Sequence, residues 1–301
     1  MVLFKSQRMC QPRFALDESQ LNADAKSATR SVGNYQMKSL ISTVTKRIEG
    51  PLVRWAAARD AHPTPLTSEI SKDDIFIVGY PKSGITWFRV MAAAALYGAD
   101  PEYLPNSLLD WLVPELIDPI SYKRWQTPML FKTHELPNPK FRRVVYLIRD
   151  GRDVVVSYYH FLKALGEDVD FATMVRPDYN IYPCPWDKHV KAWLSNPYES
   201  EILMIKYEDL KARPVDELRR FCDFLGVSRS DTLLNLIAEK SSFENMRAKE
   251  QKEGFHTFPR DKAFIRRGVV GSFKDEMPKD ALEKFTEQSK ESLCSLGYLS
   301  A

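Results

Sequence analysis

Short apolar runs alternate with amphipathic segments along most of the chain. Segments with helical spacing of their apolar residues follow several of these runs, and the one from Pro214 to Leu225 ends at Gly226. Strands that alternate with helices predict a three-layer α/β fold, in which helices cover both faces of a mostly parallel sheet. The four runs with the length and composition of buried strands are Ile75–Val78, Met129–Lys132, Val144–Ile148 and Ile202–Lys206.

The segments between these elements differ in character. We expect helices within residues 35–58 and a last helix over Asp280–Leu296. Residues 97–128 and 166–185 are rich in prolines and aromatic residues, which is typical of loops. Residues 244–261 are highly charged, and we expect this stretch to be mobile.

The composition is that of an ordinary globular protein. The chain has 301 residues, of which 44% are hydrophobic and 28% charged, and its net charge of +3 is too small to indicate a nucleic-acid partner. We expect a flexible tail over residues 1–34, with an organelle transit peptide as the alternative, and a single domain over 35–301. No apolar run approaches the length of ~18–20 residues that a membrane span requires, and the first residues lack the apolar core of a secretory signal. The four cysteines are far apart, so the sequence predicts a reduced, cytoplasmic protein.

The first strand leads into a turn with the chemistry of an anion site. After Gly79 the chain reads Tyr-Pro-Lys-Ser-Gly-Ile-Thr-Trp, and a helix follows. Gly84 lets backbone approach a ligand, Lys82 adds a charge, and the helix N-terminus adds free N–H groups. The lysine precedes the second glycine, so the turn is not a standard nucleotide-binding P-loop. An ordinary turn with a surface lysine is the alternative.

Polar side chains also follow the second and third strands. His134 comes directly after the second strand, and Arg149 directly after the third. Ligands of open parallel sheets bind at the carboxyl ends of the strands. The sequence therefore predicts that Lys82, His134 and Arg149 meet at one edge of the sheet.

These segments together resemble the cytosolic sulfotransferases. The turn Tyr80–Trp87 is similar to their 5′-phosphosulfate loop, Lys132-Thr133-His134 to their catalytic motif, and Arg149–Phe161 to their 3′-phosphate segment. Tyr207-Glu208-Asp209 and Arg266-Arg267-Gly268 match two further motifs, and the resemblance covers about residues 74–274.

The resemblance implies the donor 3′-phosphoadenosine 5′-phosphosulfate, with 3′-phosphoadenosine 5′-phosphate as the product and no metal. The residues implied at the 5′-phosphosulfate are Lys82, Ser83, Gly84, Ile85 and Thr86. At the position of Ile85 the family usually has a residue with a hydroxyl group, so Ile85 offers only its backbone N–H. Those implied at the 3′-phosphate are Arg149, Ser157, Arg266, Arg267 and Gly268. Those implied at the adenine are Trp87, Phe243, Tyr207 and Ser241.

The implied reaction is an in-line displacement at sulfur. His134 would take the proton of the acceptor, because an imidazole titrates near neutral pH. Lys82 and Lys132 would stabilise charge on the bridging oxygen, and Ser157 would restrain Lys82 until the acceptor binds. The acceptor would be a small molecule with an apolar or aromatic body that reacts through a hydroxyl or an amine. Its expected pocket residues are Trp111, Tyr158, Phe161 and Tyr182.

Two other functions are alternatives to the sulfotransferase hypothesis. A nucleotide-dependent kinase or ATPase would need a Gly-Lys-Ser/Thr turn, which is absent. A non-catalytic nucleotide-binding protein would be favoured if His134 or Lys82 were missing, and both are present. Asp275-Glu276-Met277-Pro278 does not match the short motif through which many relatives dimerise, so a homodimer is left open.

Overall fold

The computed structural model describes residues 70–116, 124, 126–255 and 258–300. The expected tail over residues 1–34 and the expected helices within residues 35–58 lie outside this range, so they stay predictions. No helix among the described residues is long and apolar enough to cross a membrane.

All four predicted strands form, and they lie in one parallel sheet with the order β2-β1-β3-β4. The register places Val78 beside Thr133 and Gly79 beside Leu147. The strands therefore end side by side along one edge. Their bounds are β1 (Ile75–Gly79), β2 (Leu130–Thr133), β3 (Arg143–Ile148) and β4 (Glu201–Lys206).

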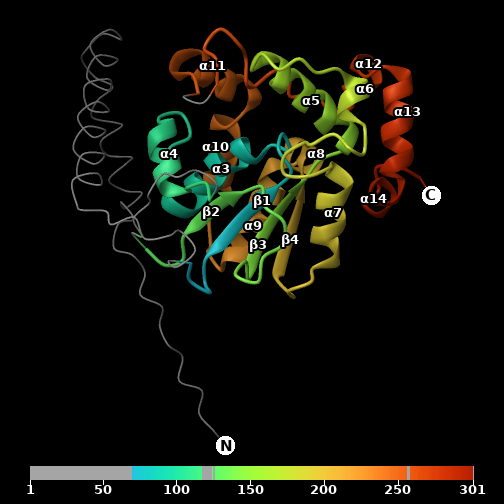
Figure 1. Cartoon of the computed structure of the whole chain (residues 1–301). Helices are drawn as coiled ribbons and strands as arrows, with labels where there is room; N and C mark the ends of the chain where they lie inside the picture. Colours follow the sequence, from blue (N-terminus) through green and yellow to red (C-terminus); the bar gives the residue numbers. More distant parts are fainter. Residues whose placement is uncertain (1–69, 117–123, 125, 256–257, 301) are drawn as a thin grey trace, which may run out of the picture. The chain divides into compact units, whose positions relative to one another are not determined.

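Helices cover both faces of the sheet, which confirms the predicted three-layer α/β fold (Figure 1). One face is covered by α3 (Ile85–Tyr97), α4 (Asn106–Leu112), α8 (Tyr207–Ala212), α9 (Pro214–Leu225) and α10 (Asp231–Lys240), and α11 (Phe243–Glu253) adds Met246 to the core on that side. The other face is covered by α5 (Gly151–Ala164), α6 (Phe171–Met174), α7 (Trp186–Ser195), α12 (Phe273–Glu276), α13 (Lys279–Gln288) and α14 (Lys290–Ser295).

Strand β1 supplies side chains to two hydrophobic cores, because neighbouring residues of a strand point to opposite faces. Ile75 and Ile77 belong to the core with Phe88 of α3, whereas Phe76 and Val78 belong to the core on the opposite face. All five side chains are almost completely buried. This burial on both faces explains why β1 is apolar at every position.

The structure corrects two expectations about the C-terminal third. The charged stretch that we expected to be mobile contains helix α11, although most of its side chains are exposed. The single helix expected over Asp280–Leu296 is divided into α13 and α14 at Ser289, whose φ of −100° and ψ of 9° depart from helical values.

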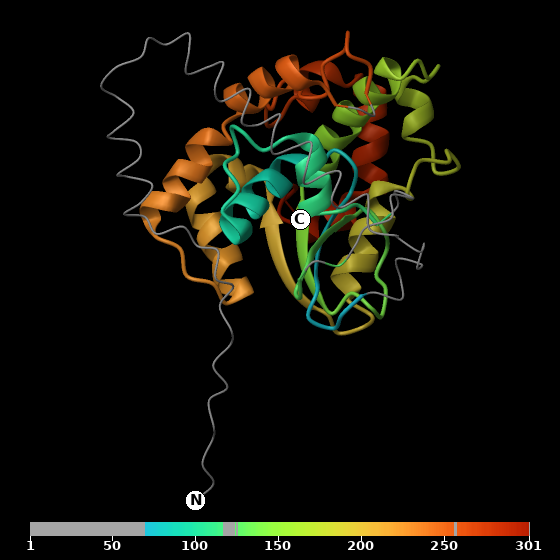
Figure 2. The same ribbon diagram turned by 90° about the vertical axis from the view of Figure 1, so that its left-hand side faces the viewer.

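The turns and helix starts after the four strands all lie at the same edge of the sheet. In both views, α11 lies beyond the carboxyl ends of the strands (Figures 1 and 2). The edge where the sequence predicts a site is thus enclosed between the ends of the strands and the helices above them.

Asp74 anchors the start of this sheet, and its replacement should lower stability. The carboxylate of Asp74 is fully buried, accepts backbone N–H groups of Ser71 (2.7 Å) and Met129 (2.9 Å), and pairs with Arg124 (2.6 Å). We expect Asp74→Ala to lower the free energy of unfolding by about 3 kcal/mol, because it leaves buried donors without their acceptor. Urea denaturation measures this change. Asp73→Ala, which alters an exposed neighbour, should change stability by less than about 0.5 kcal/mol, and equal effects of the two variants would contradict the prediction.

Candidate active site

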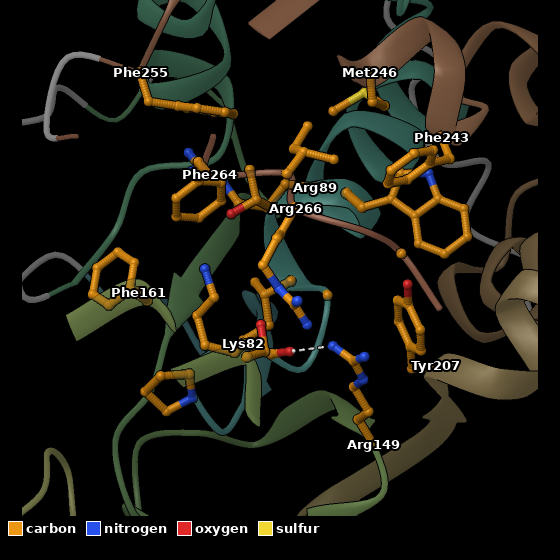
Figure 3. A pocket seen from close by; sticks show the side chains of 18 of the residues that line it. Lys82, Arg89, Arg149, Phe161, Tyr207, Phe243, Met246, Phe255, Phe264 and Arg266 are labelled. Atoms are coloured by element: carbon orange, nitrogen blue, oxygen red, sulfur yellow. Dashed lines mark hydrogen bonds between the residues drawn. The ribbon is translucent and has the colours of Figure 1, made fainter. Parts of the chain in front are cut away.

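A cavity of about 840 Å³ opens at the carboxyl ends of the strands. Figure 3 shows Lys82 between two groups of aromatic side chains, with Phe161, Phe255 and Phe264 on one side and Tyr207 and Phe243 on the other. The cavity therefore has a charged centre and two aromatic ends.

The turn after β1 brings backbone close to the cavity. Gly84 precedes α3 with a φ of 91°, a conformation that favours glycine, and a Cβ atom there would lie 2.7 Å from the ring of Tyr207. Lys82 also has a positive φ, of 71°. The buried hydroxyl of Ser83 has no hydrogen-bond partner among the described residues. Together with the free backbone N–H groups at the start of α3, these features of the turn are suited to binding an anion.

His134 presents a lone pair to the cavity. Its Nδ1 atom lies 2.7 Å from the carbonyl oxygen of Gly79, which can only accept, so Nδ1 carries the proton and Nε2 is free to accept one. Burial and then the charge of Lys132 lower the pKa of the His134 imidazole to about 3. The ring is consequently neutral at physiological pH, as a general base must be.

Helix α7 holds the backbone that carries His134. His189 donates from Nε2 to the carbonyl oxygen of His134 (3.2 Å), and Trp193 donates from its indole nitrogen to that of Glu135 (3.1 Å). Both side chains are almost fully buried. The backbone position of His134 is thereby fixed from the core.

Lys132 lies beside His134 and forms an ion pair with Glu115. Its Nζ atom is 2.8 Å from Oε1 of Glu115. Burial lowers the pKa of Lys132, and the charge of Glu115 opposes that shift. The pair therefore keeps a cation next to the free nitrogen of His134.

Lys82 lies in an aromatic cage in the free protein. Its Nζ atom is 3.7 Å from the ring centroid of Phe264 and 4.6 Å from that of Phe161. Burial and then the charge of Arg149 lower the pKa of Lys82 to about 7. Within the described part of the chain no hydrogen bond joins Lys82 to Ser157, so the restraint expected from Ser157 stays a prediction.

Arg149 connects the turn to a distant loop. It donates to the carbonyl oxygens of Lys82 (3.2 Å) and Val269 (3.1 Å), and its buried Nε has no partner among the described residues. One turn along α5, the fully buried Asp153 accepts the N–H groups of Gly271 (2.7 Å) and Phe273 (3.1 Å). Asp153 thus holds the loop after Arg267 against α5.

The two arginines of that loop share one carboxylate. Arg266 donates to both oxygens of Glu276 (2.5 and 3.0 Å), and Arg267 donates to one of them (2.7 Å). His160 lies 2.8 Å from the other oxygen. Although burial alone would raise it, the hydrogen bonds and charge of Arg266 keep the pKa of the Glu276 carboxyl below its ordinary value. Both arginines also line the cavity, so Glu276 neutralises cations that face it.

One end of the cavity has flat aromatic walls. Trp87 donates from its indole nitrogen to the carbonyl oxygen of Ser241 (2.6 Å), and its ring is edge-on to Tyr207 at 5.8 Å. Phe243 lies against Gly268, where a Cβ atom would be 2.4 Å from the phenyl ring. Trp87, Tyr207, Phe243 and Gly268 line the cavity, whereas the hydroxyl of Ser241 is buried without a partner among the described residues.

The opposite end is a cluster of phenyl rings. Phe161 stacks on Phe258 with 5.4 Å between centroids, and Phe264 packs edge-on against both of them. Tyr158 and Tyr182 line the cavity at this end, as the sequence predicts. Trp111 is absent from the lining, although its neighbour Asp110 belongs to it.

The structure thus brings most of the predicted residues together around one cavity. Those that line it are Lys82, Gly84, Ile85, Thr86, Trp87, Lys132, His134, Arg149, Ser157, Tyr158, Phe161, Tyr182, Tyr207, Phe243, Arg266, Arg267 and Gly268. Trp111, Ser83 and Ser241 lie outside the lining. The roles assigned to all of these residues stay predictions.

Sequence reasoning missed several contributors to the site. Glu115 and Glu276 pair with site cations from separate segments, and no local pattern signals such long-range contacts. The rings of Phe255 and Phe258 belong to the stretch 244–261, which was judged by its charge, and Phe264 follows that stretch directly. Asp153 offered a usable signal, since a carboxylate in the first turn of a helix, four residues after Arg149, favours a capping or positioning role.

Known proteins resemble this chain in sequence. Residues 72–297 match a family model described as "Sulfotransferase domain". Mouse "Sulfotransferase 1E1" is 28% identical over 251 residues, which cover 73% of this chain and 83% of that protein. Human "Sulfotransferase 2B1" is 30% identical over 243 residues, which cover 73% of this chain and 66% of that protein.

Solved structures resemble it in fold. A retinol dehydratase in complex with retinol and PAP has a TM-score of 0.64 at 18% identity, covering 76% of this chain and 83% of that one. Mouse sulfotransferase SULT7A1 complexed with PAP has a TM-score of 0.57 at 23% identity, covering 76% of this chain and 88% of that one. The family model spans far more than half of the sequence and includes every strand of the sheet. The resemblance drawn from the motifs is confirmed, and the chain belongs to the sulfotransferase family.

Proposed function

We propose that this protein transfers the sulfuryl group of 3′-phosphoadenosine 5′-phosphosulfate to a hydroxyl or amine of a small, partly apolar acceptor. The observation that carries the proposal is the convergence of three groups on one cavity. The free Nε2 of His134 and the amines of Lys82 and Lys132 face a space with an aromatic chamber at each end. One chamber suits an adenine and the other an acceptor ring.

The residues present fit this donor. Arg149 lines the cavity, and its buried Nε is a donor without a partner among the described residues, from which a phosphate or sulfate oxygen would accept. Gly84 and Gly268 leave backbone open beside the rings of Tyr207 and Phe243. The neighbours complexed with PAP support the same ligand class.

Each charged residue has a role in the proposed reaction. The donor supplies a sulfuryl group on a bridging oxygen, and that oxygen gains negative charge as its bond to sulfur breaks. Lys82 and Lys132 would stabilise this charge. His134 would accept the acceptor's proton at Nε2, while its hydrogen bond to Gly79 keeps that nitrogen aimed into the cavity. A sulfuryl group carries less charge than a phosphoryl group, so we propose no metal.

The first test is the binding of 3′-phosphoadenosine 5′-phosphate, measured by calorimetry without metal. We expect micromolar affinity for the wild type and at least tenfold weaker binding for Arg266→Ala, because a bidentate contact to phosphate is lost. Glu276→Gln should act in the opposite direction, since it releases Arg266 and Arg267 from a competing carboxylate. If the wild type does not bind, the proposal fails, and ATP with magnesium becomes the ligand to try.

Binding should also take up protons at Lys82. With a pKa of about 7, this amine is half protonated at pH 7 in the free protein, and a bound anion favours the charged form. We therefore expect uptake of about 0.5 proton at pH 7 and much less at pH 5.5, where the amine already carries its proton. Calorimetry in buffers of different ionisation enthalpy measures this number. Lys82→Arg keeps a permanent charge and should abolish that uptake; an unchanged value would show that another group takes up the proton.

Turnover should depend on His134. We expect a panel of phenols, alcohols and amines with labelled donor to yield at least one sulfated product. His134→Ala should reduce kcat for that acceptor by about 100- to 10,000-fold, the usual worth of a general base, while binding of 3′-phosphoadenosine 5′-phosphate stays within about threefold of the wild type. Equal turnover by the variant would remove His134 from the mechanism. Binding without turnover on any acceptor would favour a non-catalytic nucleotide-binding protein.

A further inference from the structure

Two hydrogen-bond acceptors converge where the nucleophile of the proposed reaction has to lie. Oε1 of Glu115 is 3.8 Å from Nε2 of His134. The Nε2 atom has a lone pair because Nδ1 donates to Gly79, and a carboxylate oxygen accepts only. An atom that gives its proton to His134 is thus within reach of a second acceptor.

The position of Glu115 is built into the backbone. Lys132 donates its N–H to the carbonyl oxygen of Pro114 (2.8 Å), and Leu116 donates to the carbonyl oxygen of Lys132 (3.0 Å). These bonds place residues 115 and 132 side by side as a parallel bridge next to β2. Pairing with β2, the strand that leads into His134, therefore positions the carboxylate of Glu115 at the cavity.

The ion pair with Lys132 leaves Glu115 able to accept more hydrogen bonds. A carboxylate has about four acceptor positions, and Lys132 contacts one oxygen at 2.8 Å. The Glu115 side chain lines the cavity and keeps 29% of its surface exposed. Lys132 thus places a positive charge beside the Glu115 carboxylate without occupying all of its acceptor positions.

Hydroxyl and amine nucleophiles differ in how they meet this pair. A hydroxyl has a single proton, so once it points at His134 the carboxylate faces an oxygen lone pair, which repels it. A neutral amine has two N–H bonds and can donate to both groups. We propose that Glu115 adapts this site to amine acceptors with an aromatic body, so that the protein is an N-sulfotransferase; this inference rests on the proposed function.

The amine lone pair forms the N–S bond, and the bond from sulfur to the bridging oxygen breaks with its electron pair on that oxygen, where Lys82 and Lys132 lie. One N–H proton passes to Nε2 of His134. The second N–H remains on nitrogen in the sulfamate product and keeps its hydrogen bond to Glu115.

The test compares paired acceptors that differ only in the nucleophile, such as 2-naphthylamine and 2-naphthol. The readout is the ratio of kcat/KM for the amine to that for the phenol, measured with the same donor. Effects on the donor, Lys132 and His134 are common to both acceptors and cancel in the ratio. We expect Glu115→Leu to lower the ratio about 10- to 100-fold, the worth of one hydrogen bond to a charged group. Glu115→Gln keeps a carbonyl acceptor and should lower it less.

Two controls keep the result interpretable. Glu135 follows His134 in the chain but does not line the cavity, and its carboxylate accepts from the hydroxyl of Tyr182 (3.4 Å). Glu135→Gln removes this negative charge, keeps an acceptor for Tyr182, and should leave the ratio within about twofold. Affinity for 3′-phosphoadenosine 5′-phosphate should be the same in wild type and Glu115→Leu, which shows that the fold and donor site persist.

The outcomes separate the two proposals. An unchanged ratio in Glu115→Leu, or turnover of phenols but of no amine, overturns the role of Glu115 while the sulfotransferase function stands. No binding of 3′-phosphoadenosine 5′-phosphate by the wild type overturns the proposed function itself. A ratio that falls in Glu115→Leu and not in Glu135→Gln supports the inference.

Discussion

The hydrogen bond from His134 to the carbonyl oxygen of Gly79 is the contact on which the site depends. It joins the ends of β1 and β2, which pair in parallel up to Val78 and Thr133. Because the carbonyl can only accept, the bond decides which ring nitrogen holds the proton. The same Gly79 leads into the turn that carries Lys82, so His134 and Lys82 are both positioned from one point of the sheet.

Several positively charged side chains line this cavity, and different interactions offset their mutual repulsion in the free protein. Lys132 is paired with Glu115, and Arg266 and Arg267 with Glu276. Lys82 is left with aromatic faces, and its pKa falls to about 7 as a result of burial and of Arg149. Among the described residues Lys82 therefore has no carboxylate partner, and the proposed sulfuryl and phosphate groups would supply the missing negative charge.

The sequence predicted the parts of this structure that depend on local pattern. Buried strands read as apolar runs, and polar residues directly after them must reach the same edge, so Lys82, His134 and Arg149 were found without coordinates. The contacts that tune these groups could not be found in that way. Glu115 reaches Lys132 through a backbone bridge across 17 positions, and Glu276 reaches Arg266 from a separate helix. The helix α11 was not predicted from the sequence. It contributes only Met246 to the core, so its apolar residues show little helical periodicity.

The backbone conformation of Lys82 lowers the stability of the fold. A residue with a side chain is disfavoured at a φ of 71° by about 1 kcal/mol, whereas glycine adopts this conformation freely. Selection for stability alone would therefore replace the lysine. Lys82 nevertheless occupies this strained turn, and its side chain lines the cavity. A glycine at position 82 would therefore relieve the strain of this turn and, at the same time, remove the amine from the cavity.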